Sequence, residues 1–535
     1  MRKSILKSGI FTLVVVLILP TLSVNICGAD VDWWPMYQHD PQHTGISSSK
    51  APSTNNVLWS FKGSIMKPLC TPVVVDNRVF VTSNYAYSKN QGGVFFCLDA
   101  ETGGILWSKT FSKIRSIGSP SVDGDRVYVY PGSLDYGTGS VYCYNVTNGN
   151  LLWKKEGFGN IASSAIADGM LYFNTNTYLT PNGKGAMYCM NDMTGAIIWN
   201  RGLHIAWNSV PTVVDGRAYV TVDRDPQQSD ICCLNASTGE TIWTWVGSLK
   251  FDSVQISSAV SHGRLYIGSS GFDTLLPNGS SFHTDGLMFC VDAVNGTTLW
   301  QSSTRASYYF PAPMIYENKV YICDANYTVY CFNADSGNVI WKYQTYVYQP
   351  GKYFIMGKYG IGSLAAADGK VYANTRIDKF HACIYCFNAS TGKVLWKHAK
   401  FGWYTVVGEF AIADEKMYSP LGGRWNNNGV LLYCFSDVDS HAPAAPKISG
   451  IHFVSKGKVY NYSIRATDPD GDDIYYHICW GDGAVDQWIG PYQSGQTVSI
   501  AHTWMKSGWF EIKARAKDVN DLRGSVGALK NIIVR

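Results

Sequence analysis

Two of the chain's fourteen cysteines stand at a spacing that redox-active dithiols use. Cys383 and Cys386 form a Cys-x-x-Cys pair, an arrangement that lowers a thiol pKa in redox proteins. Here no helical pattern follows, and the surrounding residues HACIYCFN read as a strand. We therefore expect both thiols to be structural.

A second cluster has the oxygen ligands that calcium prefers. Asp468, Asp470 and Asp472 lie within the sequence DPDGDD, and closely spaced carboxylates are typical of calcium loops. The full EF-hand spacing with its closing glutamate is absent, and Asp residues also form tight turns with their own backbone. We favour a turn and keep a calcium site at these three residues as the alternative.

A third set combines aromatic rings, amides and basic groups, which suit the binding of sugars, peptides or anionic groups. These side chains fall in segments that do not repeat along the chain. We predict a ligand-binding face that contains Arg115, His204, Trp207, Asn208, Tyr309, Tyr359, Arg376, Trp403 and Trp425. Ordinary loop packing and solvated loop charges are the alternatives.

A repeated stretch fills most of the chain between these segments. Val94 to Trp107 reads VFFCLDAETGGILW. An eighth copy begins at Leu431 and stops before its tryptophan, and the missing end stands far upstream at Trp59. The other copies end at Trp153, Trp199, Trp243, Trp300, Trp341 and Trp396.

Each copy divides into four expected strands. A tight Asp-Gly or similar turn joins the first two, the third contains an aromatic-Cys pair, and the fourth ends near the tryptophan. Between the third and fourth, Asp99 can hydrogen-bond its own backbone two residues on. Gly103 can take the positive φ that closes this turn.

Four antiparallel strands recurring at intervals of about 41–57 residues predict the blades of a β-propeller. Eight cysteine slots imply eight blades, and the strand at Trp59 completes the last one. First and last segments thus close the ring and remove exposed sheet edges. The cysteine slots are Cys97, Cys143, Cys189, Cys233, Cys290, Cys331, Cys386 and Cys434.

The strand order assigns different roles to the two ends of the predicted propeller. Both short turns of every blade fall at one end, which we call the short-turn end. All long connections fall at the other, the loop end. Because binding residues concentrate on loops held by a rigid scaffold, we expect the ligand-binding face at the loop end.

The domain organisation follows from shifts in composition. We predict an export signal at 1–29, with a basic start and a short apolar run, and a lead-in segment at 30–55 that packs on the first repeat. The propeller covers 56–438, a Pro- and Ala-containing linker 439–446, and a small β-sandwich 447–535. We expect an extracellular, cell-surface or periplasmic monomer, without a transmembrane segment in the mature chain.

Charge and cysteine placement limit the function classes further. A net charge of +4 with 16% charged residues lacks the concentrated basic face that nucleic-acid binding needs. Equivalent slots in different blades stand too far apart for disulfides, which need Cα atoms within about 7 Å. We expect the eight slot cysteines to be free, buried and apolar in character.

The repeats resemble the tryptophan-docking repeats of the pyrroloquinoline-quinone (PQQ) β-propeller superfamily, as in Ala100-Glu-Thr-Gly103-Gly-Ile-Leu-Trp107. The resemblance covers about residues 32–436. It implies either a quinoprotein dehydrogenase, with PQQ, Ca²⁺, an Asp base and a vicinal disulfide, or a non-enzymatic assembly protein. The only adjacent cysteines, Cys232 and Cys233, fall in a predicted strand and should point to opposite faces.

Residues 445–535 resemble a PKD (polycystic kidney disease) domain, an Ig-like sandwich. Trp480-Gly-Asp-Gly483 and His502-Thr-Trp504 carry the resemblance. It implies an adhesive or spacer module without catalysis.

We expect a non-catalytic exported protein that binds a protein, peptide or glycan at the cell envelope, with no cofactor. The alternative is a PQQ- and calcium-dependent dehydrogenase, although no complete quinoprotein catalytic set can be assigned to residues of this chain. The fold expectation is an all-β, eight-bladed β-propeller followed by an Ig-like β-sandwich.

Overall fold

The structure is a computed structural model. It describes residues 32–62, 70–84, 92–133, 139–175, 185–205, 209–225, 228–250, 257–269, 273–275, 281–283, 286–304, 312–324, 328–345, 363–376, 381–401, 405–423, 430–437, 442–518 and 523–535. The predicted export signal at 1–29 lies outside these ranges. Within them, every regular element is a β-strand.

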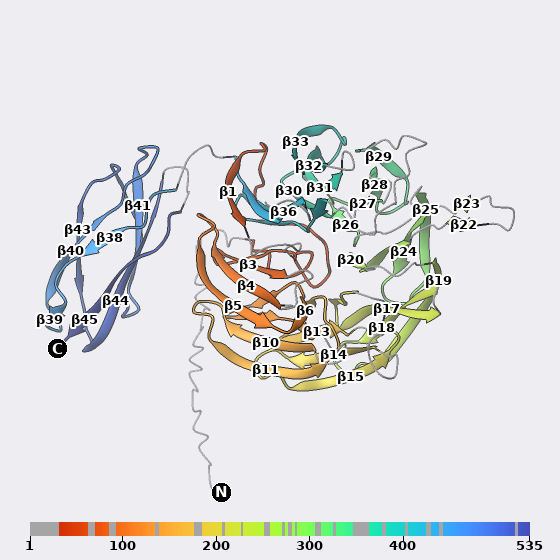
Figure 1. Cartoon of the computed structure of the whole chain (residues 1–535), viewed down its shortest axis with the longest axis horizontal. Coiled ribbons are helices and arrows are strands. Elements are labelled where there is room, and N and C mark those ends of the chain that lie inside the picture. The colour runs from red at the N-terminus through yellow and green to blue at the C-terminus, as the bar shows by residue number, and fades with distance from the viewer. Residues whose placement is uncertain are drawn as a thin grey trace, which may run out of the picture. The chain divides into compact units, whose positions relative to one another are not determined.

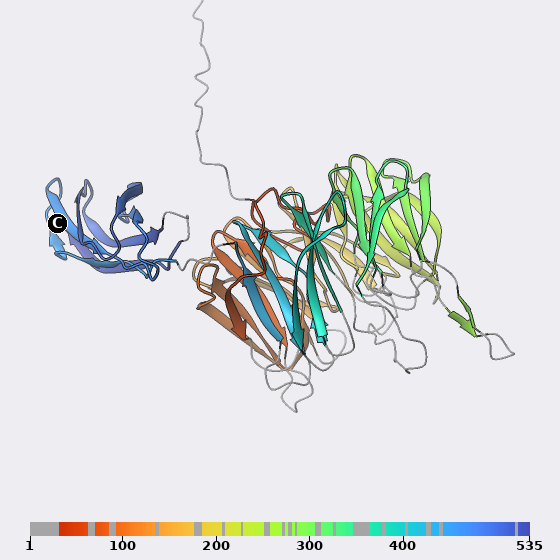
Figure 2. The same ribbon diagram turned by 90° about the horizontal axis from the view of Figure 1, so that it is seen from above.

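The repeats form a β-propeller, as predicted. In the described ranges, eight sheets each contain four strands paired antiparallel in the order of one repeat, and together they surround a common axis (Figure 1 and Figure 2). We number these sheets as blades 1 to 8, and each corresponds to one repeat of the sequence.

The strands of blades 1 to 4 follow the chain. Blade 1 has β2 (Val73–Val75), β3 (Arg78–Asn84), β4 (Gly92–Asp99) and β5 (Ile105–Ser112); blade 2 has β7 (Ser121–Asp123), β8 (Arg126–Val129), β10 (Gly139–Asn145) and β11 (Leu151–Phe158); blade 3 has β12 (Ser164–Ala167), β13 (Met170–Asn174), β14 (Gly185–Asn191) and β15 (Ile197–Leu203); blade 4 has β16 (Thr212–Val214), β17 (Arg217–Asp225), β18 (Gln228–Asn235) and β19 (Thr241–Lys250).

Blades 5 to 8 continue the pattern, and the last takes a strand from the start of the chain. Blade 5 has β20 (Ala259–Ser261), β21 (Arg264–Ser269), β24 (Gly286–Asp292) and β25 (Thr298–Thr304); blade 6 has β26 (Met314–Tyr316), β27 (Lys319–Cys323), β28 (Thr328–Asn333) and β29 (Val339–Gln344); blade 7 has β30 (Leu364–Ala367), β31 (Lys370–Arg376), β32 (His381–Asn388) and β33 (Val394–Phe401); blade 8 has β35 (Ala411–Ala413), β36 (Lys416–Gly423), β37 (Val430–Phe435) and β1 (Val57–Lys62), with β34 (Thr405–Val407) also on β36. In the described ranges, two small two-stranded sheets lie outside the blades: β6 (Ile114–Ile117) with β9 (Pro131–Ser133), and β22 (Asp273–Leu275) with β23 (Ser281–His283).

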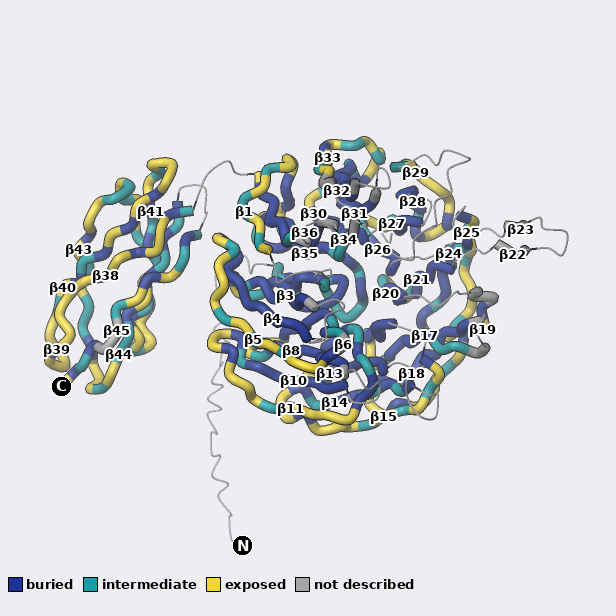
Figure 3. Tube along the Cα trace, in the orientation of Figure 1, coloured by how far each residue is buried: buried dark blue, intermediate teal, exposed yellow. Residues whose placement is uncertain are grey.

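Burial follows strand position within a blade. Every residue of β4 is buried, whereas β5 alternates between exposed and half-buried residues. The outer strands are correspondingly the more exposed ones in Figure 3. The eight slot cysteines are buried and free, which confirms the prediction that they act as small apolar residues between stacked sheets.

The tryptophan of each blade docks on the turn of the next blade. Trp107 of blade 1 donates from Nε1 to the carbonyl of Val146 in blade 2 at 3.1 Å, and Trp59 of blade 8 donates to Ala100 of blade 1 at 2.9 Å. Trp243 is an exception, because its Nε1 has no hydrogen-bond partner in the described residues. In four further repeats the indole Nε1 donates to a carbonyl oxygen of the following blade, at Trp153, Trp199, Trp300 and Trp341.

The turn glycine is required by this docking as well as by its backbone. Gly103 has φ +68°, a region that side chains disfavour. A Cβ on Gly103 would also lie 2.6 Å from the ring of Trp59. The sequence predicted the first requirement, and the structure adds the second.

The ring closes where the two halves of blade 8 meet. β1 pairs antiparallel with β37, with Trp59 opposite Cys434, as every other repeat pairs its tryptophan strand with its cysteine strand. The predicted completion of the last blade by the Trp59 strand is therefore confirmed.

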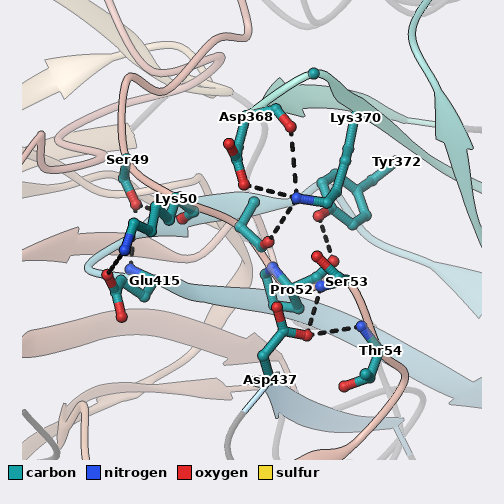
Figure 4. Close-up of polar contacts among 12 residues, drawn as sticks. Ser49, Lys50, Pro52, Ser53, Thr54, Asp368, Lys370, Tyr372, Glu415 and Asp437 are labelled. Atoms are coloured by element: carbon teal, nitrogen blue, oxygen red, sulfur yellow. Dashed lines mark hydrogen bonds and ion pairs between the residues drawn. The ribbon is translucent and has the colours of Figure 1, made fainter. Parts of the chain in front are cut away.

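The turn of blade 8 is rebuilt from two chain segments (Figure 4). In blade 1, the Asp99 carboxylate accepts the amides of Glu101 and Thr102 at 3.1 and 3.0 Å. In blade 8, Asp437 accepts the amides of Ser53 and Thr54 at 2.5 and 2.7 Å. Pro52 supplies the carbonyl on which Trp396 of blade 7 docks, at 3.3 Å. Residues about 380 positions apart thus restore the repeat's turn.

Replacement of Asp437 by alanine is expected to lower the free energy of unfolding by about 1 kcal/mol, because two backbone amides lose a carboxylate acceptor. Chemical denaturation measures the change. Asp437→Asn is the matched control, because asparagine fills the equivalent role at Asn145. Equal losses in both variants would contradict this role of the side-chain oxygen.

The lead-in segment runs through the channel on the propeller axis. Trp34 exchanges two backbone hydrogen bonds with Val74 of β2, both 2.8 Å. Further carbonyls of the segment then accept the amide of the middle residue in the first strands of blades 2, 4, 5, 6 and 7. These pairs are Pro35 with Val122, Pro41 with Val213, Gln42 with Val260, Thr44 with Ile315, and Gly45 with Ala366, at 2.7–3.1 Å.

We expected this segment to pack on the first repeat, and Trp34 does pair with Val74 there. The structure adds that the segment also follows the innermost strands of five further blades. Several of its side chains are buried there, such as Trp34, Tyr37 and His43. The Nδ1 of His43 lies 3.2 Å from the carbonyl of Ser258. Burial lowers the pKa of His43 to about 4, so this imidazole is neutral at pH 7.

The C-terminal part folds as a two-sheet β-sandwich. One sheet has β38 (Lys447–Ser449), β40 (Val459–Arg465) and β43 (Val498–Thr503); the other has β39 (Phe453–Val454), β45 (Gly527–Val534), β44 (Gly508–Lys517), β41 (Ile474–Cys479) and β42 (Val485–Tyr492). Its core contains both tryptophans of the predicted motifs, Trp480 and Trp504. No helix in the described ranges has the length and apolar character that a membrane crossing requires.

Candidate functional site

Most of the predicted ligand-binding face falls outside the described residues. His204 follows β15 and is exposed, Arg115 lies on β6 and Arg376 ends β31. The predicted role of this face therefore stays a prediction. The residues outside the described ranges are Trp207, Asn208, Tyr309, Tyr359, Trp403 and Trp425.

A ring of eight residues marks the loop end of the channel. The chain enters the first strand of every blade there, because that strand runs toward the Asp-Gly turn at the short-turn end. Val73 is the first residue of β2, and each of the other blades has an equivalent residue. The residue two positions before it in each blade belongs to the ring. We call this set the channel ring: Thr71, Ser119, Ser163, Val210, Ser257, Ala312, Ser363 and Glu409.

Seven members of the channel ring are small, neutral and buried, and the eighth is a carboxylic acid. Glu409 is half-buried and accepts a hydrogen bond from Thr71 Oγ1 across the seam between blades 8 and 1. Tyr37 of the lead-in segment packs on Val210 and Ala312. Its hydroxyl hydrogen-bonds Glu409 and Ser257. Three parts of the fold thus meet at one carboxyl group.

The electrostatics of this group are set mainly by desolvation. Burial raises the pKa of Glu409 to about 7, against the hydrogen bonds from Thr71 and Tyr37 that favour its charged form. Burial and the nearby Glu409 carboxylate raise the pKa of Tyr37 well above its ordinary value. The phenol therefore stays neutral, and Glu409 is the member of the channel ring that changes charge near neutral pH.

Glu409→Gln is expected to make the protein more stable than the parent at pH 8, by about 2–3 kcal/mol. Burial raises the pKa of Glu409 in the folded state, so its contribution to stability is complete at pH values below the ordinary glutamate pKa. This contribution is lost as the pH rises through about 7. Denaturant unfolding at pH 4.5, 6 and 8 measures the difference, which should shrink toward zero at the lowest pH. A constant difference across the series would contradict the raised pKa.

Sequence reasoning missed Glu409 although a signal was present. Aligning the eight strand entries places Ser, Thr, Ala or Val at seven positions and glutamate at one. A single charged residue in an otherwise neutral repeat position is the pattern that would have identified it.

The cysteine pairs do not form redox centres in the structure. Cys232 packs in the core between blades 3 and 4, and Cys233 in the core between blades 4 and 5, so their side chains point to opposite faces of β18. Cys383 and Cys386 likewise belong to different interblade cores, and all four thiols are free.

The described residues do not fit the PQQ and Ca²⁺ set that the resemblance implies. That set needs several carboxylate and amide oxygens and a vicinal disulfide. The channel ring has one carboxylate, and the adjacent Cys232 and Cys233 point to opposite faces of β18.

The acidic cluster in the sandwich forms a turn. Asp468 Oδ1 accepts the amides of Asp470 and Asp472 at 2.9 and 3.2 Å, which is the Asx-type turn that we favoured. Among the described residues, no three His, Cys, Asp or Glu side chains are grouped so as to hold a metal ion. The calcium alternative at Asp468, Asp470 and Asp472 stays a prediction.

Two curated proteins are similar to this chain over much of the propeller. Tetrathionate hydrolase of Acidithiobacillus ferrooxidans is 23% identical over 362 residues, which cover 61% of this chain and 66% of that enzyme. The chain thus spans slightly less than two thirds of that relative. Outer membrane protein assembly factor BamB of Moranella endobia is 24% identical over 316 residues, covering 50% of this chain and 76% of that protein.

Two solved structures are similar to separate parts of the chain. A quinohemoprotein alcohol dehydrogenase of Pseudomonas putida, 11% identical, covers 78% of this chain and 83% of its own, with a TM-score of 0.53, which concerns the fold alone. The PKD domain of a peptidase from a Thermoplasmatales archaeon is 41% identical over 18% of this chain and 99% of its own, with a TM-score of 0.18.

The family described as outer membrane protein assembly factor BamB matches residues 46–173 and 137–398, more than half of the chain. These ranges contain the docking tryptophans and turn glycines of blades 1 to 7. The chain therefore belongs to the BamB family of PQQ-type β-propellers.

Proposed function

We propose that the protein is an exported, non-catalytic binding or scaffold protein, whose loop end binds a protein, peptide or glycan at the cell envelope. The observation that carries this proposal is the path of the lead-in segment. Backbone hydrogen bonds fix it to the innermost strands of six blades, so the chain's own residues occupy the channel below the channel ring. The loop end is then left for a partner.

The repeat residues support the same division of roles. Cysteine, Asx, glycine and tryptophan of each repeat serve sheet packing, turn closure and docking between blades. Binding is therefore assigned to residues that do not repeat. Family membership and the outer-membrane role in the name of the Moranella endobia relative support a protein partner, and the predicted signal at 1–29 supports export.

The proposal is tested by capture of partners from the native cell envelope. We expect that Trp207→Ala with Trp403→Ala lowers the amount of captured partner at least tenfold. Met193→Ala with Val294→Ala is the matched control, because these exposed apolar residues lie in the turns of the short-turn end. Loss of capture in the control alone, or equal capture by both variants, would reject the loop end as the binding face.

An enzymatic role is the second candidate, and Glu409 is the observation that favours it. A half-buried carboxyl that titrates near neutral pH is suited to proton transfer, and one curated relative is a hydrolase. The quinoprotein version is tested by adding PQQ and Ca²⁺ to the purified protein. We expect neither quinone absorbance nor dye-linked alcohol oxidation, and the appearance of both would establish the dehydrogenase instead.

A further inference from the structure

We propose that the channel ring is a binding site for a compact cation, a primary ammonium group, which is held by the carboxylate of Glu409 on the propeller axis. This deepens the proposed function, on which it rests for the loop end as the binding face. Nothing in the repeat requires an acid at this position, since seven blades have a neutral side chain there.

Glu409 lacks the cation that a second glutamate at the same seam, Glu101, has. Glu101, the fully buried glutamate at the seam of blades 8 and 1, is paired with Lys416, whose Nζ lies 3.4 Å from its Oε2. Glu409 stands at the same seam but is contacted by two neutral hydroxyls, those of Thr71 and Tyr37. In the described part of the chain, no cation pairs with it. A carboxylate removed from water is costly unless it is paired, so a bound cation would stabilise its charged form.

The composition of the channel ring favours an ammonium group over a metal ion. Ser363 donates from Oγ to the carbonyl of Gly408 at 3.1 Å, and Ser163 donates to Ser119 at 3.3 Å. Because these hydroxyl protons are already used, their oxygens keep lone pairs that can accept. An ammonium group has three donors and no acceptor, whereas Ca²⁺ takes six to eight oxygens and usually several carboxylates. The ring has a single carboxylate.

Few other titratable groups bear on the site. Tyr37 is the one on the lead-in segment that contacts Glu409, and its pKa is raised. His43, on the same segment, faces Thr212 and Ser258 instead. Blade 1 contributes Thr71, which hydrogen-bonds Glu409 of blade 8. Blade 5 contributes Ser257, which hydrogen-bonds Tyr37. Because burial raises the pKa of Glu409 to about 7, binding should strengthen between pH 6 and pH 8.

The test titrates ethylamine into the full-length protein and follows binding by calorimetry and by the melting temperature. We expect binding at pH 8, at least tenfold weaker binding at pH 5.5, and at least tenfold weaker binding to Glu409→Gln at pH 8. Met193→Ala, at the short-turn end, is the matched control and should bind ethylamine as the parent does. A Glu409→Gln variant that melts at pH 5.5 at least as high as the parent is folded, because the neutral side chain removes the cost of ionising Glu409.

Two further arms identify the source of the ammonium group. If ethylamine displaces the envelope partner captured by the protein, the ammonium group belongs to a lysine of that partner. If the partner stays bound, the site binds a free amine. The inference is overturned if ethylamine does not bind, if Glu409→Gln binds it as well as the parent does, or if Ca²⁺ displaces it at equal concentration. Capture that survives any of these failures would leave the proposed function intact.

Discussion

A chain that lacks residues 30–66 is expected to lose the single cooperative unfolding transition of the propeller. The deletion removes β1, so β37 becomes an exposed sheet edge. It also removes Trp59, which docks on Ala100 and Gly103 of blade 1, and the lead-in segment that joins six blades. Differential scanning calorimetry measures the transition.

The expected size of the effect follows from the interactions that the deletion removes. At least seven backbone hydrogen bonds between the lead-in segment and the first strands contribute about 1 kcal/mol each. Loss of the docked tryptophan alone costs about 3–5 kcal/mol. The sum matches or exceeds the usual stability of a domain, about 5–15 kcal/mol. Deletion of residues 447–535 is the control and should leave the propeller transition in place. A 30–66 deletion that melts as sharply and as high as the parent would refute ring closure.

Lys416→Met is expected to lower the free energy of unfolding by about 3–5 kcal/mol, because it leaves Glu101 buried without its cation. The side chains of Glu101 and Lys416 are 0% and 4% exposed. Burial raises the pKa of Glu101, and Lys416 opposes that shift. Although burial opposes its charge, the carboxylates of Glu101 and Asp414 hold the pKa of Lys416 above its ordinary value. The lysine's contribution is therefore complete at neutral pH and is lost only as the pH rises above the ordinary lysine range.

The repeat provides a matched control at another seam. Arg264 holds the same position in blade 5 and pairs with Asp335 of blade 6, with side chains 31% and 55% exposed. Because exposed ion pairs contribute about 0–1 kcal/mol, Arg264→Met should cost far less than Lys416→Met. The double variant Glu101→Leu with Lys416→Met should regain most of the loss. If the double variant is as unstable as Lys416→Met, the unpaired carboxylate is not the cause.

The parts of the fold that could be predicted have a side-chain signature that repeats. Cys97, Gly103 and Trp107 recur at fixed spacing, and each has one physical role, so the sequence predicts the strands, their turns and the closure by Trp59. The lead-in path could not be predicted in this way. It depends on backbone groups, such as the Pro35 carbonyl and the Val122 amide, which any sequence presents alike.

The candidate site was harder to predict for a different reason. Glu409, Thr71 and Tyr37 are brought together by the closed ring and by the lead-in segment, so their proximity depends on contacts far apart in the sequence. The turn of blade 8 was difficult to predict for a similar reason. Asp437 comes three positions after Cys434, whereas Asp99 comes two positions after Cys97. The cysteine pairs were predicted correctly as structural, because strand alternation alone fixes where adjacent side chains point.

The central claim is that the loop end of the propeller binds the partner while the repeats act as a scaffold. Site-specific photocrosslinking in the native cell envelope tests it most directly. A photoreactive residue is placed at Trp207 or Tyr309 at the loop end, or at Asp168 or Asp215 in the turns of the short-turn end. We predict crosslinked partner from the first pair and none from the second. Crosslinks from Asp168 and Asp215, with none from Trp207 and Tyr309, would contradict the claim.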